Sequence, residues 1–200
     1  MNRFVRFETA FVGLLVLAGL AVAQAKEEKK TPARHQGAGR VYDKDAGFSF
    51  EPPKGWEKVA NAQNMIFNFK QPVKVGEAEV GNVNVVSAAD EVTPEKLAEQ
   101  LKDYYPKQFK NWKLTDDTMT TVDGKKTYQI AGRHTVSDAS GKKFDASVLQ
   151  YYSFSPNKKV YIVTFTTRED VFPKLRKTLE QSALSSQMDF FCRAWFSYRV

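Results

Sequence analysis

The stretch "AGFSFEPPKGWEKV", residues 46–59, decides how the fold begins. Phe48 and Phe50 alternate with a serine, which is the period of a strand, and two prolines follow at once. Proline has no N–H group for a strand ladder, so pairing must end there. A glycine then allows a turn before Trp56. We predict that Phe48, Phe50, Pro53 and Trp56 are structural, with Trp56 packing over the sheet edge. A ligand-stacking role for Trp56 is the alternative.

Two later segments have the pattern of amphipathic helices. Residues 94–105 follow Thr93, a good N-cap, and begin with Pro94, which suits the first helical position. Pro106 should end or kink this helix. The second helix falls within residues 168–184. The inward-facing side chains are Leu97 and Leu101 in the first helix, and Phe172, Leu175 and Leu179 in the second.

The remaining segments read as strands joined by tight turns. Strands near 47–51, 64–72 and 78–88 precede the first helix, and four more follow it, with a hairpin turn at Asp123-Gly124. The last strand, 159–167, is apolar on both faces, so both faces of the sheet must be covered. These patterns predict an α+β fold, a central and largely antiparallel β-sheet flanked by two main helices.

The N-terminus resembles an export signal. Arg3 and Arg6 precede an apolar run at 11–22, and small residues follow it. A membrane anchor is the alternative, but a spanning helix needs about 20 apolar residues and this run is shorter. We therefore predict a signal peptide at 1–25, removed after Ala23 or Ala25, and an exported protein, periplasmic or extracellular, with no transmembrane segment after cleavage.

The charge lies mostly outside the predicted domain. The chain carries a net charge of +7, yet residues 41–184 hold 21 Lys and Arg against 19 Asp and Glu. Their lysines are scattered without interleaved aromatic residues, which argues against nucleic acid as a partner. Residues 26–40 are polar and basic and predict a disordered linker between the signal peptide and a domain at 41–184.

The C-terminal tail, residues 185–200, has an atypical composition. Five aromatic residues crowd into it, and it contains Cys192, the single cysteine, so no internal disulfide can form. Three interpretations stay open for this tail: an extension packed on the domain, a docking segment for a partner, or an altered reading frame. The aromatic residues are Phe190, Phe191, Trp195, Phe196 and Tyr198.

Catalytic and metal-binding motifs are missing from the sequence. The two histidines, His35 and His134, have no second ligand at a metal-like spacing. An S-x-x-K match at 140–143 falls in a predicted turn, where it cannot orient a lysine. We therefore predict no catalytic residue, no metal and no cofactor. A small-ligand pocket could still form between sheet and helices, around Arg133, His134, Tyr151 and Tyr152.

The order of these motifs resembles the PsbP-like superfamily. That group includes the extrinsic PsbP subunit of photosystem II, a yeast nuclear Ran-binding factor and many small exported bacterial proteins. The resemblance covers residues 41–184 and implies an α/β/α sandwich whose known members act mostly by docking to partners. The segments that carry it are "GFSF" at 47–50 with Pro53 and Trp56, "NVNV" at 82–85, "TPEKL" at 93–97 and "VYIVTFTT" at 160–167.

Two hypotheses follow for function. The first is a non-enzymatic, monomeric, exported domain that binds an unknown protein or envelope component as an accessory or assembly factor. The second is a small-ligand-binding protein or weak hydrolase that uses the pocket between sheet and helices. The second requires the four pocket side chains to converge.

Overall fold

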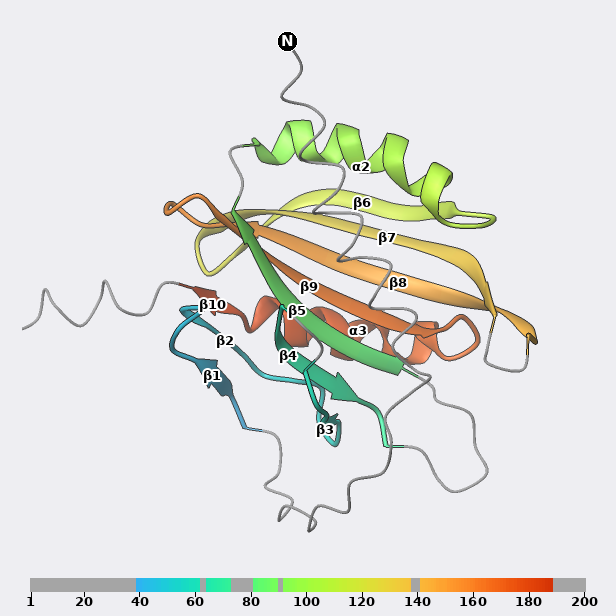
Figure 1. Ribbon diagram of the computed structural model, residues 1–200, viewed down its shortest axis with the longest axis horizontal. Helices are drawn as coiled ribbons and strands as arrows, with labels where there is room; N and C mark the ends of the chain where they lie inside the picture. The colour runs from blue at the N-terminus through green and yellow to red at the C-terminus, as the bar shows by residue number, and fades with distance from the viewer. Residues whose placement is uncertain (1–38, 62–63, 73–80, 90–91, 138–140, 189–200) are drawn as a thin grey trace, which may run out of the picture.

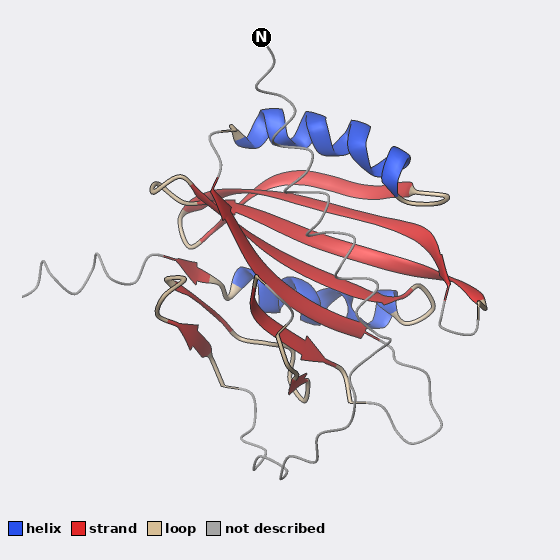
Figure 2. Cartoon of the chain, in the orientation of Figure 1, coloured by secondary structure: helices blue, strands red, loops and turns tan. Residues whose placement is uncertain are grey.

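The computed structural model describes residues 39–61, 64–72, 81–89, 92–137 and 141–188 of the chain. The predicted signal peptide, most of the linker, and residues 189–200 with Cys192 lie outside these described residues. Within them, a seven-stranded sheet and two helices form the body of the molecule, and a three-stranded sheet lies beside them (Figures 1 and 2).

Strands fill most of the described chain. The elements in chain order are β1 (Val41–Asp43), β2 (Phe48–Phe50), β3 (Glu57–Lys58), β4 (Met65–Lys70), β5 (Gly81–Ala89), α2 (Pro94–Gln108), β6 (Lys113–Val122), β7 (Lys125–Ser137), β8 (Lys143–Phe154), β9 (Lys159–Arg168), α3 (Phe172–Leu184) and β10 (Gln187–Met188).

The large sheet has the order β3-β4-β5-β9-β8-β7-β6, and every neighbouring pair is antiparallel. Short connections join β6 through β9 in sequence. β5 lies beside β9 although α2 and three strands separate the two along the chain. The predicted antiparallel sheet with two flanking helices is confirmed. The register shifts within β6 between Leu114 and Asp116, a bulge that bends this edge strand.

The two faces of the sheet carry separate apolar cores. Neighbouring residues in a strand point to opposite faces, and here Val85 and Val86 belong to different cores, as do Ile162 and Val163. One core packs under α2 through Leu97 and Leu101, and the other packs under α3 through residues such as Leu179. The prediction that both faces of the sheet are covered is therefore confirmed (Figure 1).

Helix α2 begins as its sequence indicates. The Thr93 hydroxyl accepts a hydrogen bond from the Lys96 N–H, and Pro94 occupies the first turn. The helix continues beyond Pro106 to Gln108, so of the two expectations for Pro106, an end or a kink, the end is wrong. Two residues of the helix, Lys107 and Gln108, follow the proline, whose missing N–H removes one backbone hydrogen bond near the C-terminal end. The Phe109 N–H still closes on the Tyr105 carbonyl.

The first predicted strand does not join the large sheet. β2 is instead the centre of a small sheet, with β1 on one side and β10 on the other. The two prolines explain why β2 ends at Phe50, because proline has no N–H group to continue the pairing. Phe48 and Phe50 are fully buried and pack onto the α3 side of the large sheet, where the Phe48 ring stacks 5.1 Å from Tyr161.

Trp56 lies buried in the same core as Phe48 and Phe50, with 7% of its surface exposed. The backbone N–H of Trp56 donates to the Pro53 carbonyl at 3.0 Å, which closes the turn after the prolines. The ring reaches Gly81 at the start of β5, where an added Cβ would lie 3.3 Å from the tryptophan. The indole thus packs against the first residue of β5 within this core.

Candidate functional site

The four side chains predicted to line a pocket lie on two opposite faces of the sheet. Tyr151 belongs to the core under α3, and Tyr152 belongs to the core under α2. His134 packs against Phe109 at the end of α2, whereas its neighbour Arg133 lies on the α3 face, near Glu169. The four therefore do not converge on one pocket, as the second hypothesis requires.

Under α2, Tyr152 takes part in a buried polar cluster. The hydroxyls of Tyr105 and Tyr152 lie 2.5 Å apart, and both reach the Gln150 side-chain oxygen. The Gln150 amide then donates to the Thr164 hydroxyl at 2.9 Å. This cluster ties the helix to β8 and β9 and fills the space between them. Because its members are far apart in sequence, no local pattern predicted it.

The chemistry of this cluster favours hydrogen bonding over proton transfer. Burial raises the pKa of Tyr105 well above its ordinary value, and the neighbouring Tyr152 adds to the shift. The pKa of Tyr152 is also raised, chiefly by burial. Both phenols therefore stay protonated at neutral pH, where they act as hydrogen-bond donors and are poor bases or nucleophiles.

His134 lies among aromatic rings where α2 ends. Its ring centroid is 4.6 Å from Phe109 and 6.4 Å from Trp112, and only 9% of the residue is exposed. Burial lowers the pKa of His134, and the carboxylate of Asp145 partly opposes that change. The imidazole is therefore held neutral in the folded protein. This environment is that of a packing residue rather than a contact for a partner.

The lowered pKa of His134 gives a pH-dependent stability. An unfolded histidine takes up a proton near pH 6.5, whereas the folded one resists it. The unfolded state thus binds more protons as the pH falls below about 6.5, so the free energy of unfolding should decrease there. We expect thermal midpoints between pH 7.5 and 5.5 to fall more for the wild type than for His134→Phe. Equal falls in both proteins would contradict this.

Arg133 is the one member of the four with a substantially exposed side chain, 41% by surface. Its guanidinium lies 3.8 Å from a Glu169 carboxylate oxygen, and the other oxygen of that carboxylate accepts from the Ser147 hydroxyl. A solvent-exposed pair at this distance contributes little to stability. Arg133 is thus presented at the surface, where it can meet a partner without disturbing the core.

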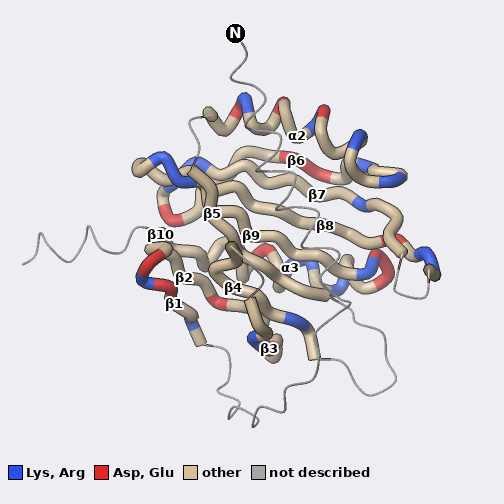
Figure 3. The backbone as a smooth tube through the Cα atoms, in the orientation of Figure 1, with Lys and Arg blue, Asp and Glu red and all other residues tan. Residues whose placement is uncertain are grey.

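Other charged groups tie the edge strand β6 to both helices. Lys102 of α2 pairs with Asp117 at 2.6 Å, and Arg176 of α3 pairs with Asp116 and with Glu180. In the described ranges no three His, Cys, Asp or Glu side chains gather as metal ligands would. Figure 3 shows blue and red segments interspersed along α2 and at the turns, without one stripe of a single sign.

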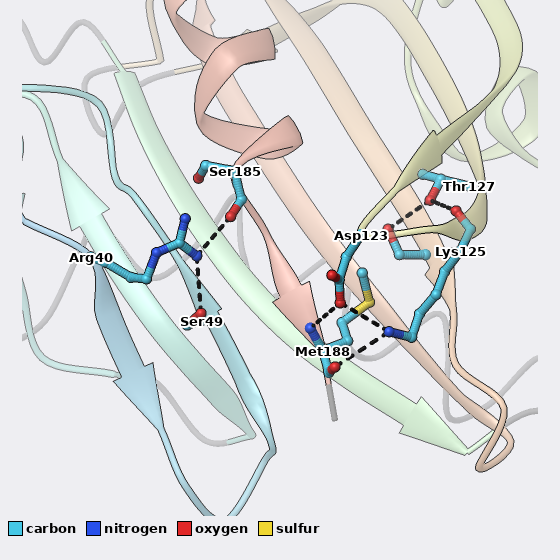
Figure 4. Close-up of polar contacts among 8 residues, drawn as sticks. Arg40, Ser49, Asp123, Lys125, Thr127, Ser185 and Met188 are labelled. Atoms are coloured by element: carbon cyan, nitrogen blue, oxygen red, sulfur yellow. Dashed lines mark hydrogen bonds and ion pairs between the residues drawn. The ribbon is translucent and has the colours of Figure 1, made fainter. Parts of the chain in front are cut away.

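A second polar cluster joins the end of the described chain to the β6–β7 turn. The Met188 N–H donates to the Asp123 carboxylate at 2.9 Å, and Lys125 donates to the Met188 carbonyl and to Asp123 (Figure 4). Nearby, Arg40 donates to Ser49 and to the Ser185 carbonyl. Residues 185–188 belong to the predicted atypical tail. These contacts make them part of the packed structure.

A shallow cavity of about 360 Å³ lies at another corner, between the β8–β9 turn and the residue that precedes the N-cap of α2. It is lined by Val92, Phe154, Ser155, Pro156, Lys158, Lys159 and Val160. None of the four predicted pocket residues contributes to it. No helix among the described residues is both long and apolar enough to cross a membrane.

Comparison with known proteins identifies related folds. A model of the PsbP family matches residues 36–188. Among solved structures, cyanobacterial PsbP (CyanoP) from Synechocystis sp. PCC 6803 is similar with a TM-score of 0.55 and 15% identity, over 80% of this chain and 98% of that one. The Ran-binding protein Mog1p of Saccharomyces cerevisiae is similar with a TM-score of 0.53 and 8% identity, over 79% of this chain and 98% of that one.

A third similar structure is LpqN, described as involved in cell envelope biogenesis of Mycobacterium tuberculosis. Its TM-score is 0.50 with 13% identity, over 79% of this chain and 89% of that one. At these identities the structures show a shared fold and no more. No curated protein sequence matches the chain.

Proposed function

Because this chain belongs to the PsbP family, we propose that it is an exported, non-enzymatic domain that binds a protein or envelope component as an accessory or assembly factor. Two relatives of the fold support a binding role by their descriptions, one as Ran-binding and one as involved in envelope biogenesis. The basic residues and apolar run that open the sequence support export. We further propose that the domain acts as a monomer.

The observation that carries this proposal is the placement of the four predicted side chains. Three of them, His134, Tyr151 and Tyr152, are buried, and they are divided between two cores on opposite sides of the sheet. The interfaces between sheet and helices are filled by aromatic rings and by the cluster around Tyr105. The domain therefore binds its partner through its outer surface. Of the four predicted side chains, Arg133 is the one that can contact a partner there.

The experiment is capture of partners from envelope extracts of the native host by the purified domain. We expect specific retention by the wild type, and at least about tenfold weaker retention by Arg133→Glu, since reversing a charge at a contact costs more than about 1 kcal/mol. The thermal midpoint should barely change, because the substitution is at the surface. Lys54→Glu, the same charge reversal at another exposed position, serves as the matched control.

Two results would count against the proposal. Retention that is equal for Arg133→Glu and wild type would remove Arg133 from the contact surface. Failure to retain any component, together with turnover of a substrate by the pure protein, would remove the binding role itself and favour the weak hydrolase.

A further inference from the structure

The cavity of about 360 Å³ beside the β8–β9 turn combines apolar and positively charged lining residues. Its volume is within the range of small-ligand sites, about 300–1,000 Å³. Two consecutive lysines contribute to it, and none of the described residues that line it is Asp or Glu. The apolar lining residues are Val92, Phe154, Pro156 and Val160, and the polar ones are Ser155, Lys158 and Lys159.

The β8–β9 turn that forms part of this lining is closed by two backbone hydrogen bonds. The Ser155 N–H donates to the Lys159 carbonyl at 2.8 Å, and the Lys158 N–H donates to the Ser155 carbonyl at 3.2 Å. Pro156 and Asn157 occupy the centre of the turn, and both residue types are common there. In a three-residue loop of this kind, the next position is left-handed and favours glycine.

Lys158 occupies this left-handed position, with φ +61°. Among the residues that the structure describes, three other non-glycine residues have a positive φ, namely Asn64, Asn111 and Asp123. The short side chains of Asn and Asp tolerate this conformation, whereas a lysine is strained in it. Backbone strain of this kind concentrates at functional positions. The strain at Lys158 therefore indicates a role for its side chain, which a glycine would lack.

We propose that this cavity binds a small organic carboxylate. The positive charge of Lys158 and Lys159 holds the carboxylate group, because hydrogen bonds between ionised groups are stronger than neutral ones. The apolar part of the ligand packs on Phe154 and Val160, which belong to the end of the core under α2. The inference goes beyond the proposed function and is independent of it, since Arg133 does not line the cavity.

Titration of the full chain with octanoate, followed by amide NMR, tests the proposal. Octanoate carries a carboxylate on an apolar chain, octanol replaces the carboxylate with a neutral group, and inorganic phosphate has no apolar part. We expect saturable shift changes at the amides within residues 154–160 with octanoate, and at least about tenfold weaker binding of octanol and of phosphate. The absence of saturable changes there, or equal binding of either comparison compound, would overturn the proposal.

The variant Lys158→Gly separates binding from stability. Glycine adopts a positive φ without strain, so the thermal midpoint should stay the same or rise. Loss of the ammonium group should weaken octanoate binding by at least about fivefold. Binding equal to that of the wild type would show that Lys158 does not hold the carboxylate, and this would overturn the proposal.

Arg133→Glu is the control variant, because it changes the charge of the protein away from the cavity. Arg133 pairs in register with Ser147, seven residues before Phe154 in β8, which is about 23 Å along the strand. This variant should bind octanoate as the wild type does, whether or not it retains a partner from envelope extracts. Weakening of octanoate binding to the same degree as in Lys158→Gly would assign the binding to overall charge and overturn the site.

Discussion

Replacement of Trp56 by alanine should lower the free energy of unfolding by about 3–5 kcal/mol. The indole is buried in the core on the α3 side and reaches Gly81 of β5, so its removal opens a cavity in that core beside β5. For a chain of this size, each kcal/mol shifts the thermal midpoint by roughly 2–4 °C. The measurement is a thermal melt of the purified variant beside the wild type.

Tyr42→Ala is the control for this experiment. Tyr42 is 63% exposed and lies on β1 of the small sheet, so its loss should change the free energy of unfolding by no more than about 0.5 kcal/mol. A midpoint for Trp56→Ala that matches the wild type, with loss of partner retention, would mean that Trp56 is a recognition residue. The alternative role for this tryptophan would then be the correct one.

Gly132→Ala should destabilise the protein by about 1–3 kcal/mol, an unusually large effect for a single added methyl group. The Trp112 ring lies directly over Gly132, so that an added Cβ would overlap the indole. The ring would have to move away from Tyr105, whose ring centroid is 4.8 Å distant, and from Phe109 at 5.6 Å. Denaturant unfolding of the variant measures the loss.

A double-mutant cycle identifies the cause. In a Trp112→Ala background the overlap disappears, and Gly132→Ala should then be neutral or stabilise by about 0.4–1 kcal/mol, because alanine restricts the unfolded chain. Gly124→Ala is the comparison: Gly124 has φ +71° and open space around it, so its cost is backbone strain and should not depend on Trp112. Equal costs for Gly132→Ala in both backgrounds would exclude the steric explanation.

Local patterns in the sequence were sufficient to predict the main helices, strands and turns. The apolar run of β9, the Thr93-Pro94 helix start and the Asp123-Gly124 turn each depend on residues close in sequence, and each appears where expected. The two-residue strands β3 and β10 are too short to show any period. β10 exists because the chain after α3 meets β2, a contact that only the tertiary structure brings about.

The four side chains predicted to line a pocket do not converge, and the reason was already present in the sequence. Arg133 and His134 are consecutive in one strand, as are Tyr151 and Tyr152 in the next, and consecutive strand residues point to opposite faces. This rule alone places the two members of each pair on opposite faces of the sheet. By contrast, the partners of Tyr105 and the overlap of Trp112 with Gly132 join residues on different elements, so no spacing in the sequence predicts them.

The small sheet also constrains the order in which the chain can fold. Ser49 of β2 pairs with Gln187 of β10, so two strands from opposite ends of the described chain must meet. The entropy cost of closing such a long loop favours early formation of the local hairpins β6 through β9. A nascent chain therefore cannot complete the pairing of β2 until residues 187 and 188 have been synthesised. We therefore expect the pairing of β2 with β10 to be a late step of folding, and a truncation before residue 187 to leave one side of β2 open.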